Sequence, residues 1–201
     1  MKKTLLVSSL LIVTALLVSA RWGTKAVNAP PLNDLPATDT TLTVALSLQD
    51  MVSQSDVIAI GNCVDTKSVW VDRSLVTLAT VSVSESLKGS GASTVTVELP
   101  GGVDANRKIP IAMTYPGAPN LTPGEDVVLF LTATGEVGGT YNVTGFSQGK
   151  FSIVTDEDGE QLVSRNLTKT SLKSNNGVRR GGAELMPLAN LKEQVKGLLN
   201  Q

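Results

Sequence analysis

The hydrophobic and polar positions of the chain alternate with a period of two residues over long stretches. Residues 76–87 alternate apolar and polar side chains, and residues 94–99 do so again before Pro100 and two glycines end the pattern. Such alternation is typical of a strand with one buried face. Two further runs, 57–64 and 127–131, are mostly apolar. The first predicts a strand that buries alternate residues, and the second predicts a central strand.

Turns and an irregular stretch separate the remaining strand candidates. Residues 103–124 contain four prolines and no clear pattern, which predicts a long irregular excursion. Further strands are predicted at residues 141–146, 150–154 and 161–163. An acidic segment with the pair Asp158-Gly159 joins the last two, and Asp-Gly is a strong hairpin signal. The polar stretch 167–182 predicts a mobile loop.

Two helices are predicted, one on each side of the strand-rich region. Ser47 is placed to cap a helix N-terminus, with Asp50 three residues further on as in a capping box. A C-terminal helix is predicted over residues 187–199, because Pro187 suits the first helical turn and apolar residues recur at helical spacing. That apolar stripe comprises Leu188, Leu191, Val195, Leu198 and Leu199.

These elements together predict a mainly β fold. Five or six strands with a short N-terminal helix and an amphipathic C-terminal helix favour one domain over residues 46–201. We expect a small, partly open barrel of the oligonucleotide/oligosaccharide-binding (OB) type. Residues 21–45 are rich in Pro, Ala, Asn and Thr and show no periodicity, which predicts an extended linker in front of this domain.

The N-terminus has the organisation of a secretory signal. Lys2 and Lys3 precede an uncharged, mainly apolar stretch over residues 5–18, and Val18-Ser19-Ala20 supplies the small residues that signal peptidase reads. The stretch is short for a membrane-spanning helix, which needs about 20 apolar residues. Residues 1–20 therefore predict a cleaved signal peptide and a periplasmic or extracellular destination. The alternative is an uncleaved N-terminal anchor, in which case only this segment would contact the membrane.

Composition and charge exclude several classes of function. The chain has 201 residues, with 17 Lys and Arg against 18 Asp and Glu, a formal net charge of −1. Nucleic-acid-binding proteins normally display an excess of positive charge, so no nucleic-acid partner is expected. Histidine is absent, which excludes Ser-His-Asp and Cys-His catalysis and His-ligated metal centres.

Cys63 is the only cysteine of the chain. A single cysteine excludes an intrachain disulfide, an iron–sulfur cluster and a cysteine-rich zinc site. Because Cys63 lies in an apolar strand-like run, we expect a small buried hydrophobic residue, and the alternatives are an intermolecular disulfide or a reactive thiol. The sequence predicts no catalytic, cofactor-binding or metal-binding residue and no cofactor.

Four local patterns allow a chemical interpretation beside a plain one. The acidic segment 156–160 is a solvated hairpin turn or a weak calcium site. Arg179-Arg180 belongs to a soluble loop or attracts anionic polymers. Val81, Val83 and Glu85 fall on one side of their strand, and Glu85 facing Glu98 across paired strands would imitate a glycosidase carboxylate pair. The glycan acceptor pattern begins at Asn120, Asn142 and Asn166 and agrees with surface turns.

The order of segments resembles a known module. It comprises Ser55-Asp56 before an apolar strand, residues 81–87 followed by Lys88-Gly89, residues 94–99 with Pro100-Gly101, and the turn and strand over 121–131. This order is similar to the netrin-type module shared with tissue inhibitors of metalloproteinases, which has an OB fold. It is also similar to a widespread type of exported bacterial β-domain with a helix, an SD-apolar strand and an LKG succession.

The resemblance covers about residues 46–163 and implies a fold more than a function. Metalloproteinase inhibitors of this fold place a cysteine at the mature N-terminus, where it chelates the zinc of the protease. The corresponding residue here is Arg21, and none of the inhibitory residues has a matching position.

The leading functional hypothesis is an exported, non-enzymatic interaction or structural domain of the cell envelope or the extracellular space. Its expected partner is a protein or a polysaccharide. The alternatives are a polysaccharide-active hydrolase that uses carboxylates, and a protease inhibitor by fold resemblance. A cleft lined by two close carboxylates, or by Ser beside a buried Lys, would favour an enzyme.

Overall fold

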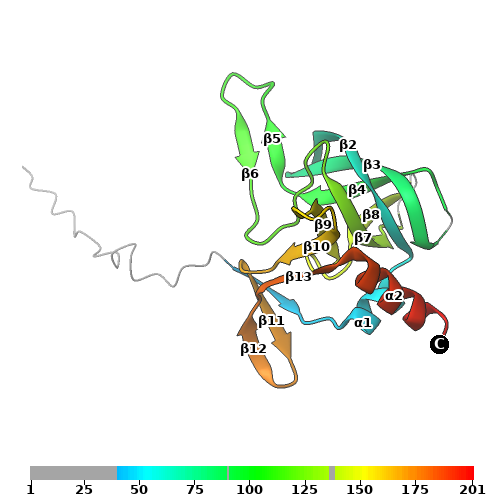
Figure 1. Ribbon diagram of the computed structural model, residues 1–201. Helices are drawn as coiled ribbons and strands as arrows, with labels where there is room; N and C mark the ends of the chain where they lie inside the picture. The colour runs from blue at the N-terminus through cyan, green and yellow to red at the C-terminus, as the bar shows by residue number, and fades with distance from the viewer. Residues whose placement is uncertain (1–39, 90, 136–138) are drawn as a thin grey trace, which may run out of the picture. The chain divides into compact units, whose positions relative to one another are not determined.

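The computed structural model describes residues 40–89, 91–135 and 139–201, and this part of the chain is mainly β (Figure 1). The chain divides into two units, residues 1–36 and residues 37–201. The signal segment predicted at residues 1–20 and most of the linker predicted at 21–45 lie outside the described residues. Every element described below belongs to the second unit.

The described residues form thirteen strands and two helices, more strands than the five or six predicted. The first elements are β1 (Thr41–Val44), α1 (Leu48–Gln54), β2 (Val57–Val71), β3 (Ser74–Lys88), β4 (Thr94–Pro100), β5 (Gly102–Asp104) and β6 (Ile111–Met113). The others are β7 (Asp126–Ala133), β8 (Thr140–Val143), β9 (Lys150–Thr155), β10 (Gln161–Asn166), β11 (Thr170–Ser174), β12 (Gly177–Arg180), β13 (Ala183–Pro187) and α2 (Leu188–Leu199).

Eight strands form the main sheet, in the order β13-β10-β9-β7-β2-β3-β4-β8. Strand β8 pairs with β7 as well as with β4, so hydrogen bonding passes from β7 through β2, β3, β4 and β8 back to β7. The sheet is mixed, because β4 and β8 run parallel whereas β2, β3 and β7 pair antiparallel. Two smaller sheets complete the unit, β1-β11-β12 and β5-β6.

Residues 57–61 of β2 and residues 127–131 of β7 are buried on both faces, as their apolar sequences require. One face of each strand enters a cluster of small aliphatic side chains enclosed by β2, β3, β4, β7 and β8. In this cluster lie Ala59, Cys63, Val81, Val97, Val127, Leu129, Leu131 and Val143, with Leu121 from the loop before β7. The prediction that residues 127–131 form a central strand is confirmed.

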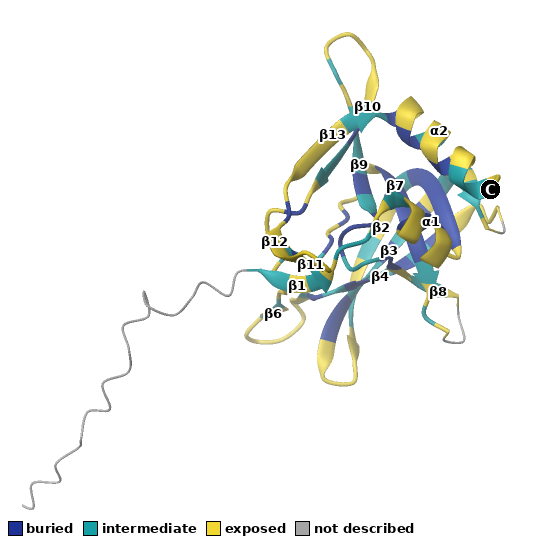
Figure 2. Cartoon of the chain, turned by 90° about the horizontal axis from the view of Figure 1, so that it is seen from below, coloured by how far each residue is buried: buried dark blue, intermediate teal, exposed yellow. Residues whose placement is uncertain are grey.

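The opposite face of β2 and β7 packs against the two helices. Phe130 and Phe151 lie in this second cluster with their ring centroids 5.8 Å apart. Both helices contribute buried side chains to it: Met51 and Val52 from α1, and Leu188, Leu191 and Val195 from α2. Figure 2 shows the exposed side of each helix turned away from these strands. Within the described part of the chain, both clusters are built from residues of the second unit.

Both predicted helices are present. Ser47 caps α1 through a capping box, in which the Ser47 side chain accepts from the Asp50 N–H and the Asp50 carboxylate accepts from the Ser47 N–H. Helix α2 begins at Leu188 with Pro187 as its N-cap and ends at Leu199, which agrees with the predicted helix over residues 187–199. No helix of the described residues is both long enough and apolar enough to cross a membrane.

The predicted alternation fails in the middle of β3, because the pairing between β2 and β3 is interrupted by register shifts. Gly61 pairs with Val83 and Ile60 pairs with Glu85, so Ser84 has no register partner on β2, although its hydroxyl donates to the Ile60 carbonyl at 3.1 Å. A residue left out of the ladder is the mark of a β-bulge. Glu85 therefore does not share the face of Val83.

A glycine is required at the bulge. A Cβ on Gly61 would lie 2.2 Å from the carbonyl oxygen of Ser82. This distance is too short for two atoms that are not bonded to each other. The close approach of the two backbones thus excludes every other residue type at this position.

Three segments differ from the prediction. The stretch 167–182, expected to be a mobile loop, contains the hairpin β11–β12, with Ser174 paired to Gly177 across a two-residue turn. Residues 41–44, assigned to the linker, form β1 and pair with β11 in parallel. The excursion over 103–124 is irregular only in part, because β5 and β6 pair across its first half. Short strands with distant partners leave little periodicity in the sequence.

Candidate functional site

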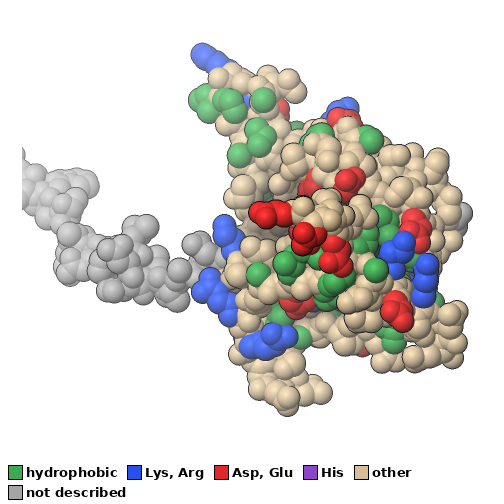
Figure 3. Space-filling model, viewed as in Figure 1, with side chains coloured by type: hydrophobic (Ala, Val, Ile, Leu, Met, Phe, Trp, Pro, Cys, Tyr) green, Lys and Arg blue, Asp and Glu red, His purple; other side chains and the backbone are tan. Residues whose placement is uncertain are grey.

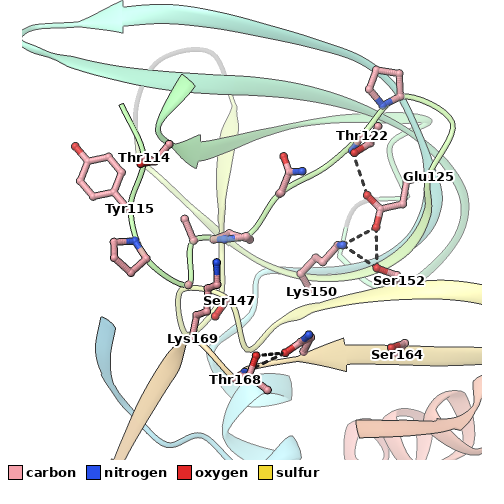
Figure 4. A pocket seen from close by; sticks show the side chains of 17 residues that line it. Thr114, Tyr115, Thr122, Glu125, Ser147, Lys150, Ser152, Ser164, Thr168 and Lys169 are labelled. Atoms are coloured by element: carbon pink, nitrogen blue, oxygen red, sulfur yellow. Dashed lines mark hydrogen bonds and ion pairs between the residues drawn. The ribbon is translucent and has the colours of Figure 1, made fainter. Parts of the chain in front are cut away.

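A groove of about 980 Å³ opens beside β9 and β10 (Figure 4). The loop between β6 and β7 supplies one wall, with residues 114–125, and the other wall comes from β9, β10 and the residues that follow β10. Most of the lining side chains are hydroxyls and amides, with one exposed aromatic ring, Tyr115. The lining is therefore polar and rich in groups that both donate and accept hydrogen bonds.

Two copies of the sequence Asn-Leu-Thr build this lining. In the first copy, Asn120 and Thr122 line the groove and Leu121 is buried, and in the second copy Asn166 and Thr168 line it and Leu167 is buried. In the second copy the chain leaves β10 at Asn166 and enters a turn closed by the hydrogen bond from the Thr170 N–H to the Leu167 carbonyl. Each leucine thus anchors its segment in the interior, while the polar residues on either side of it face the groove.

The loop that carries Tyr115 is fixed to the opposite wall at Gly117. Gly117 has a φ of 68°, and a Cβ on it would lie 2.6 Å from the carbonyl oxygen of Lys169. The hydroxyl of Thr41 in β1 also donates to the carbonyl of Pro116. These contacts hold the two walls together at one end of the groove.

A charged cluster closes the other end. The Glu125 carboxylate accepts a hydrogen bond from the Lys150 ammonium at 2.5 Å and one from the Ser152 hydroxyl at 2.7 Å, both at Oε1. Lys150 Nζ also lies 2.8 Å from Ser152 Oγ. The second carboxylate oxygen accepts from the backbone N–H of Thr122 at 3.1 Å. Figure 4 shows these contacts on the side of the groove away from Tyr115.

The cluster favours a fixed ion pair. Burial alone raises the pKa of the Glu125 carboxyl, but the hydrogen bonds from Lys150 and Ser152 outweigh burial, and the net pKa is below its ordinary value. Glu125 is therefore an anion at neutral pH that accepts hydrogen bonds from Lys150 and Ser152 at the same oxygen. An ionised carboxylate cannot act as a general acid.

Cys63 lies directly behind this cluster, but its thiol is inert. The backbone N–H of Cys63 donates to the Glu125 carbonyl at 2.9 Å, and the side chain is fully buried. Burial raises the pKa of the Cys63 thiol, and the negative charge of Glu125 raises it further. Cys63 thus behaves as the small buried residue that the sequence predicted, not as a nucleophile.

The alternative in which Glu85 faces Glu98 across paired strands is not realised. Glu98 pairs with Leu78, whereas Glu85 pairs with Ile60 further along the hairpin, so the two carboxylates do not face each other. The Glu85 carboxylate instead accepts from Lys192 of α2 at 2.5 Å. The hydrogen bond from Lys192 lowers the pKa of Glu85, as expected of an ion pair between a strand and a helix.

The acidic segment 156–160 is the predicted hairpin turn between β9 and β10. The Asp156 carboxylate accepts from the backbone N–H groups of Asp158 and Glu160, and Gly159 has a φ of 82°. Asp156 therefore stabilises the turn itself. Among residues 40–89, 91–135 and 139–201, no three Asp, Glu, His or Cys side chains come together as a metal ion would need.

The remaining sequence candidates divide between the groove and other surfaces. Asn120 and Asn166 line the groove, and Asn142 lies in β8 outside it. Arg179 and Arg180 lie on β12 and are exposed. Sequence reasoning did not single out Lys150 and Ser152, which lie in the strand predicted over residues 150–154. The repeated Asn-Leu-Thr was the one available signal for the groove.

No protein-family model matches the chain, and no curated protein is significantly similar to it.

Proposed function

We propose that this chain is an exported, non-enzymatic binding domain of the cell envelope or the extracellular space, and that the groove receives its partner. The groove supports this proposal, because it is large enough for a ligand and presents unengaged polar groups beside a fixed ion pair. Export rests on the signal-like residues 1–20. The uncleaved anchor remains the alternative form of attachment.

The pairing of strands supports an OB-type barrel as the scaffold. Hydrogen bonding returns to β7 after passing through four other strands, and a five-stranded barrel of this kind requires such a circuit. We therefore propose that these five strands form an OB-like barrel, with β9, β10 and β13 added at its side. The netrin-like module has the same class of fold, and we propose that relationship on the same grounds.

A polysaccharide fits the groove better than an apolar peptide does. Sugar hydroxyls both donate and accept hydrogen bonds, as do the amides and hydroxyls of the lining. The exposed ring of Tyr115 offers an apolar face to a sugar ring. The Asn120 side chain has no hydrogen-bond partner within the described part of the chain, so its amide is available to a ligand.

The hydrolase alternative lacks support in the groove. Glycoside hydrolysis needs a protonated acid beside a second carboxylate. Glu125 is the single carboxylate among the lining residues of the described chain, and Lys150 and Ser152 hold it as an anion. Ser152 beside Lys150 has the composition of a Ser–Lys dyad, but both side chains donate to the same oxygen of the Glu125 carboxylate. We expect no labelling of Ser152 by a fluorophosphonate probe.

The test uses residues 21–201 on an array of neutral oligosaccharides, with an array of unstructured peptides beside it. Asn120→Ala should weaken oligosaccharide binding about fivefold, the loss of about 1 kcal/mol for one hydrogen bond. Tyr115→Ala should weaken it about 3- to 10-fold. Asn142→Ala is the matched control, because it changes the same residue type in the same sequence pattern outside the groove.

Loss of binding with Asn142→Ala, or equal binding by all three variants and the unmodified chain, would contradict a role for the groove. Binding to peptides alone would replace the polysaccharide by a protein partner.

A further inference from the structure

The outer face of the small sheet β1-β11-β12 is unusually apolar for an exposed surface. Residues paired across this sheet project on the same side. One rung consists of Leu42, Ser171 and Arg180, and the next consists of Val44, Lys173 and Val178. The three aliphatic side chains are exposed: Leu42 by 59%, Val44 by 63% and Val178 by 60%.

The inner face of the same sheet is buried, which fixes the orientation of the outer one. Thr170 and Leu172 are almost fully covered, and they alternate with Ser171 and Lys173 along β11. The outer face is therefore the solvent side of a real sheet and carries three aliphatic side chains, two cations and one hydroxyl.

The hairpin β11–β12 and the residues beside it carry positive charges that no acidic side chain neutralises in the described part of the chain. Lys169, Lys173, Arg179 and Arg180 lie within and beside the hairpin, and none of them has an ion-pair partner in the described part of the chain. Residues 166–183 contain no Asp or Glu. In Figure 3, Lys and Arg side chains gather on the side of the molecule where Figure 1 places β11 and β12.

We propose that the outer face of β1-β11-β12 is a docking surface for an anionic phospholipid bilayer. The cations would meet the headgroups, and Leu42, Val44 and Val178 would enter the interface between headgroups and acyl chains. This proposal concerns the attachment of the domain to a membrane surface. It does not depend on which ligand the groove binds.

Charge decides against two other occupants. The preceding residues 1–39 contain Lys2, Lys3, Arg21 and Lys25 against Asp34 and Asp39, a formal charge of 4 − 2 = +2. Because that segment is itself positively charged, the positive outer face of β1-β11-β12 would repel it. A second copy packed face to face would set Lys173 and Arg180 against the same two residues of its partner, which is unfavourable for the same reason.

The position of β1 in the sequence also favours a bilayer. Strand β1 begins at Thr41, and the only long uncharged apolar stretch of the chain, residues 5–18, precedes it. Among the described residues, β1 is the first element after that stretch. The sheet that contains β1 is therefore the described sheet nearest to the signal-like segment along the chain.

The test is sedimentation of residues 21–201 with vesicles of phosphatidylglycerol and phosphatidylcholine, compared with pure phosphatidylcholine vesicles. We expect binding to the anionic vesicles only, decreasing as salt is raised. Each cation near an anionic surface contributes about fivefold, so Lys173→Gln with Arg180→Gln should weaken binding about 25-fold. Lys67→Gln with Lys108→Gln is the matched control, because both residues are exposed, lie elsewhere and lose the same charge.

A second measurement reports insertion directly. An environment-sensitive fluorophore attached to Val178→Cys should shift its emission to the blue on addition of anionic vesicles. The same fluorophore on Ile109→Cys should not, because Ile109 is 77% exposed on the loop between β5 and β6, away from the proposed docking surface.

Absence of vesicle binding would overturn the proposal, and so would equal binding to neutral vesicles or equal losses in the two double variants. A concentration-dependent dimer that Val178→Ser weakens and Lys173→Gln with Arg180→Gln strengthens would assign the face to a second copy instead. Arg180 Nε donates to the backbone carbonyl of Thr168 in the groove, so oligosaccharide binding is measured on the single variant Lys173→Gln, which we expect to leave it unchanged, and the two proposals fail separately.

Discussion

Glu125 and Lys150 form a half-buried ion pair, with 2.5 Å between the carboxylate oxygen and the ammonium nitrogen. Glu125 ends the loop that walls the groove, and Lys150 begins β9 on the other side of it. The pair therefore connects the two walls and sets the charge of the groove at that end.

Replacing Glu125 should change how stability depends on pH. The folded protein holds the pKa of Glu125 below its ordinary value of 4.5, so the stabilisation is fully present above that value and is lost as pH falls through the lower, folded pKa. Glu125→Gln should lower the free energy of unfolding at pH 7 by about 1–3 kcal/mol, because Lys150 is left without its counterion. It should also flatten the decrease in stability between about pH 5 and pH 3. Urea unfolding at several pH values measures both effects.

Glu157→Gln is the control for this prediction, since Glu157 is exposed in the hairpin turn after β9. Equal pH dependence in the unmodified protein and Glu125→Gln would show that the ion pair does not stabilise the fold.

Two glycines of the groove loop should respond differently to substitution. Gly117 and Gly124 both have positive φ, 68° and 88°, but a Cβ on Gly117 would meet the Lys169 carbonyl at 2.6 Å whereas a Cβ on Gly124 has open space. Gly124→Ala should cost about 1 kcal/mol from backbone strain alone. Gly117→Ala should cost about 1–3 kcal/mol more, because the loop must also move. Thermal denaturation of the two variants gives the comparison, and equal losses would mean that the contact with Lys169 is unimportant.

The two buried leucines of the Asn-Leu-Thr segments should determine the stability of the groove walls. Leu121 is 3% exposed and Leu167 is 2% exposed. Truncation of either to Ala leaves a cavity and should lower the free energy of unfolding by about 2–5 kcal/mol. Leu185→Ala, at a position 62% exposed in β13, should change it by less than about 0.5 kcal/mol. Chemical denaturation separates these cases, and a neutral Leu167→Ala would show that the second segment is not anchored by its leucine.

The thiol of Cys63 should be protected in the folded protein. Its side chain is fully buried and its pKa is raised by burial, so the reactive thiolate is both scarce and inaccessible. Reaction with a disulfide reagent should be at least about 100-fold slower in buffer than in denaturant. A variant with Cys63→Ala and Val178→Cys provides the exposed comparison. Rapid native-state labelling of Cys63 would contradict the packing described for β2.

The sequence predicted those elements whose signals are local. The capping box of Ser47 and Asp50 involves residues three positions apart, and the apolar stripe of α2 lies within one helix. The hairpin at Gly159 also depends on neighbouring residues only. Each of these signals can be recognised without knowing what the segment packs against.

Other elements depend on distant partners and could not be predicted in the same way. Strand β1 exists because Thr43 pairs with Leu172 far along the chain, and four residues of Thr, Leu and Val in a linker-like stretch give no periodicity. The face of Glu85 depends on a bulge opposite Gly61, which the alternation in β3 does not reveal. Asn175-Asn176-Gly177 is a hairpin signal, but the polar residues around it, within the stretch 167–182, predict a loop and hide the two strands.

Predicting the groove would require both local sequence signals and knowledge of which distant segments come together. The repeated Asn-Leu-Thr is visible in the sequence, but the proximity of its two copies depends on how the loop before β7 and the end of β10 are brought together. Lys150 and Ser152 are two residues apart on β9 and therefore share a face. Only the position of Glu125 makes them an ion-paired cluster.

The different burial of the residues in each Asn-Leu-Thr segment has a consequence for protein engineering. Leucine packs in the interior in both segments, and in the second segment Asn166 Oδ1 also accepts hydrogen bonds from the N–H and the hydroxyl of Thr168 and so stabilises the turn after β10. A combinatorial library at residues 120 and 122 alone should consequently yield folded proteins at high frequency, and selection from it could give the groove new ligands with little loss of thermal tolerance.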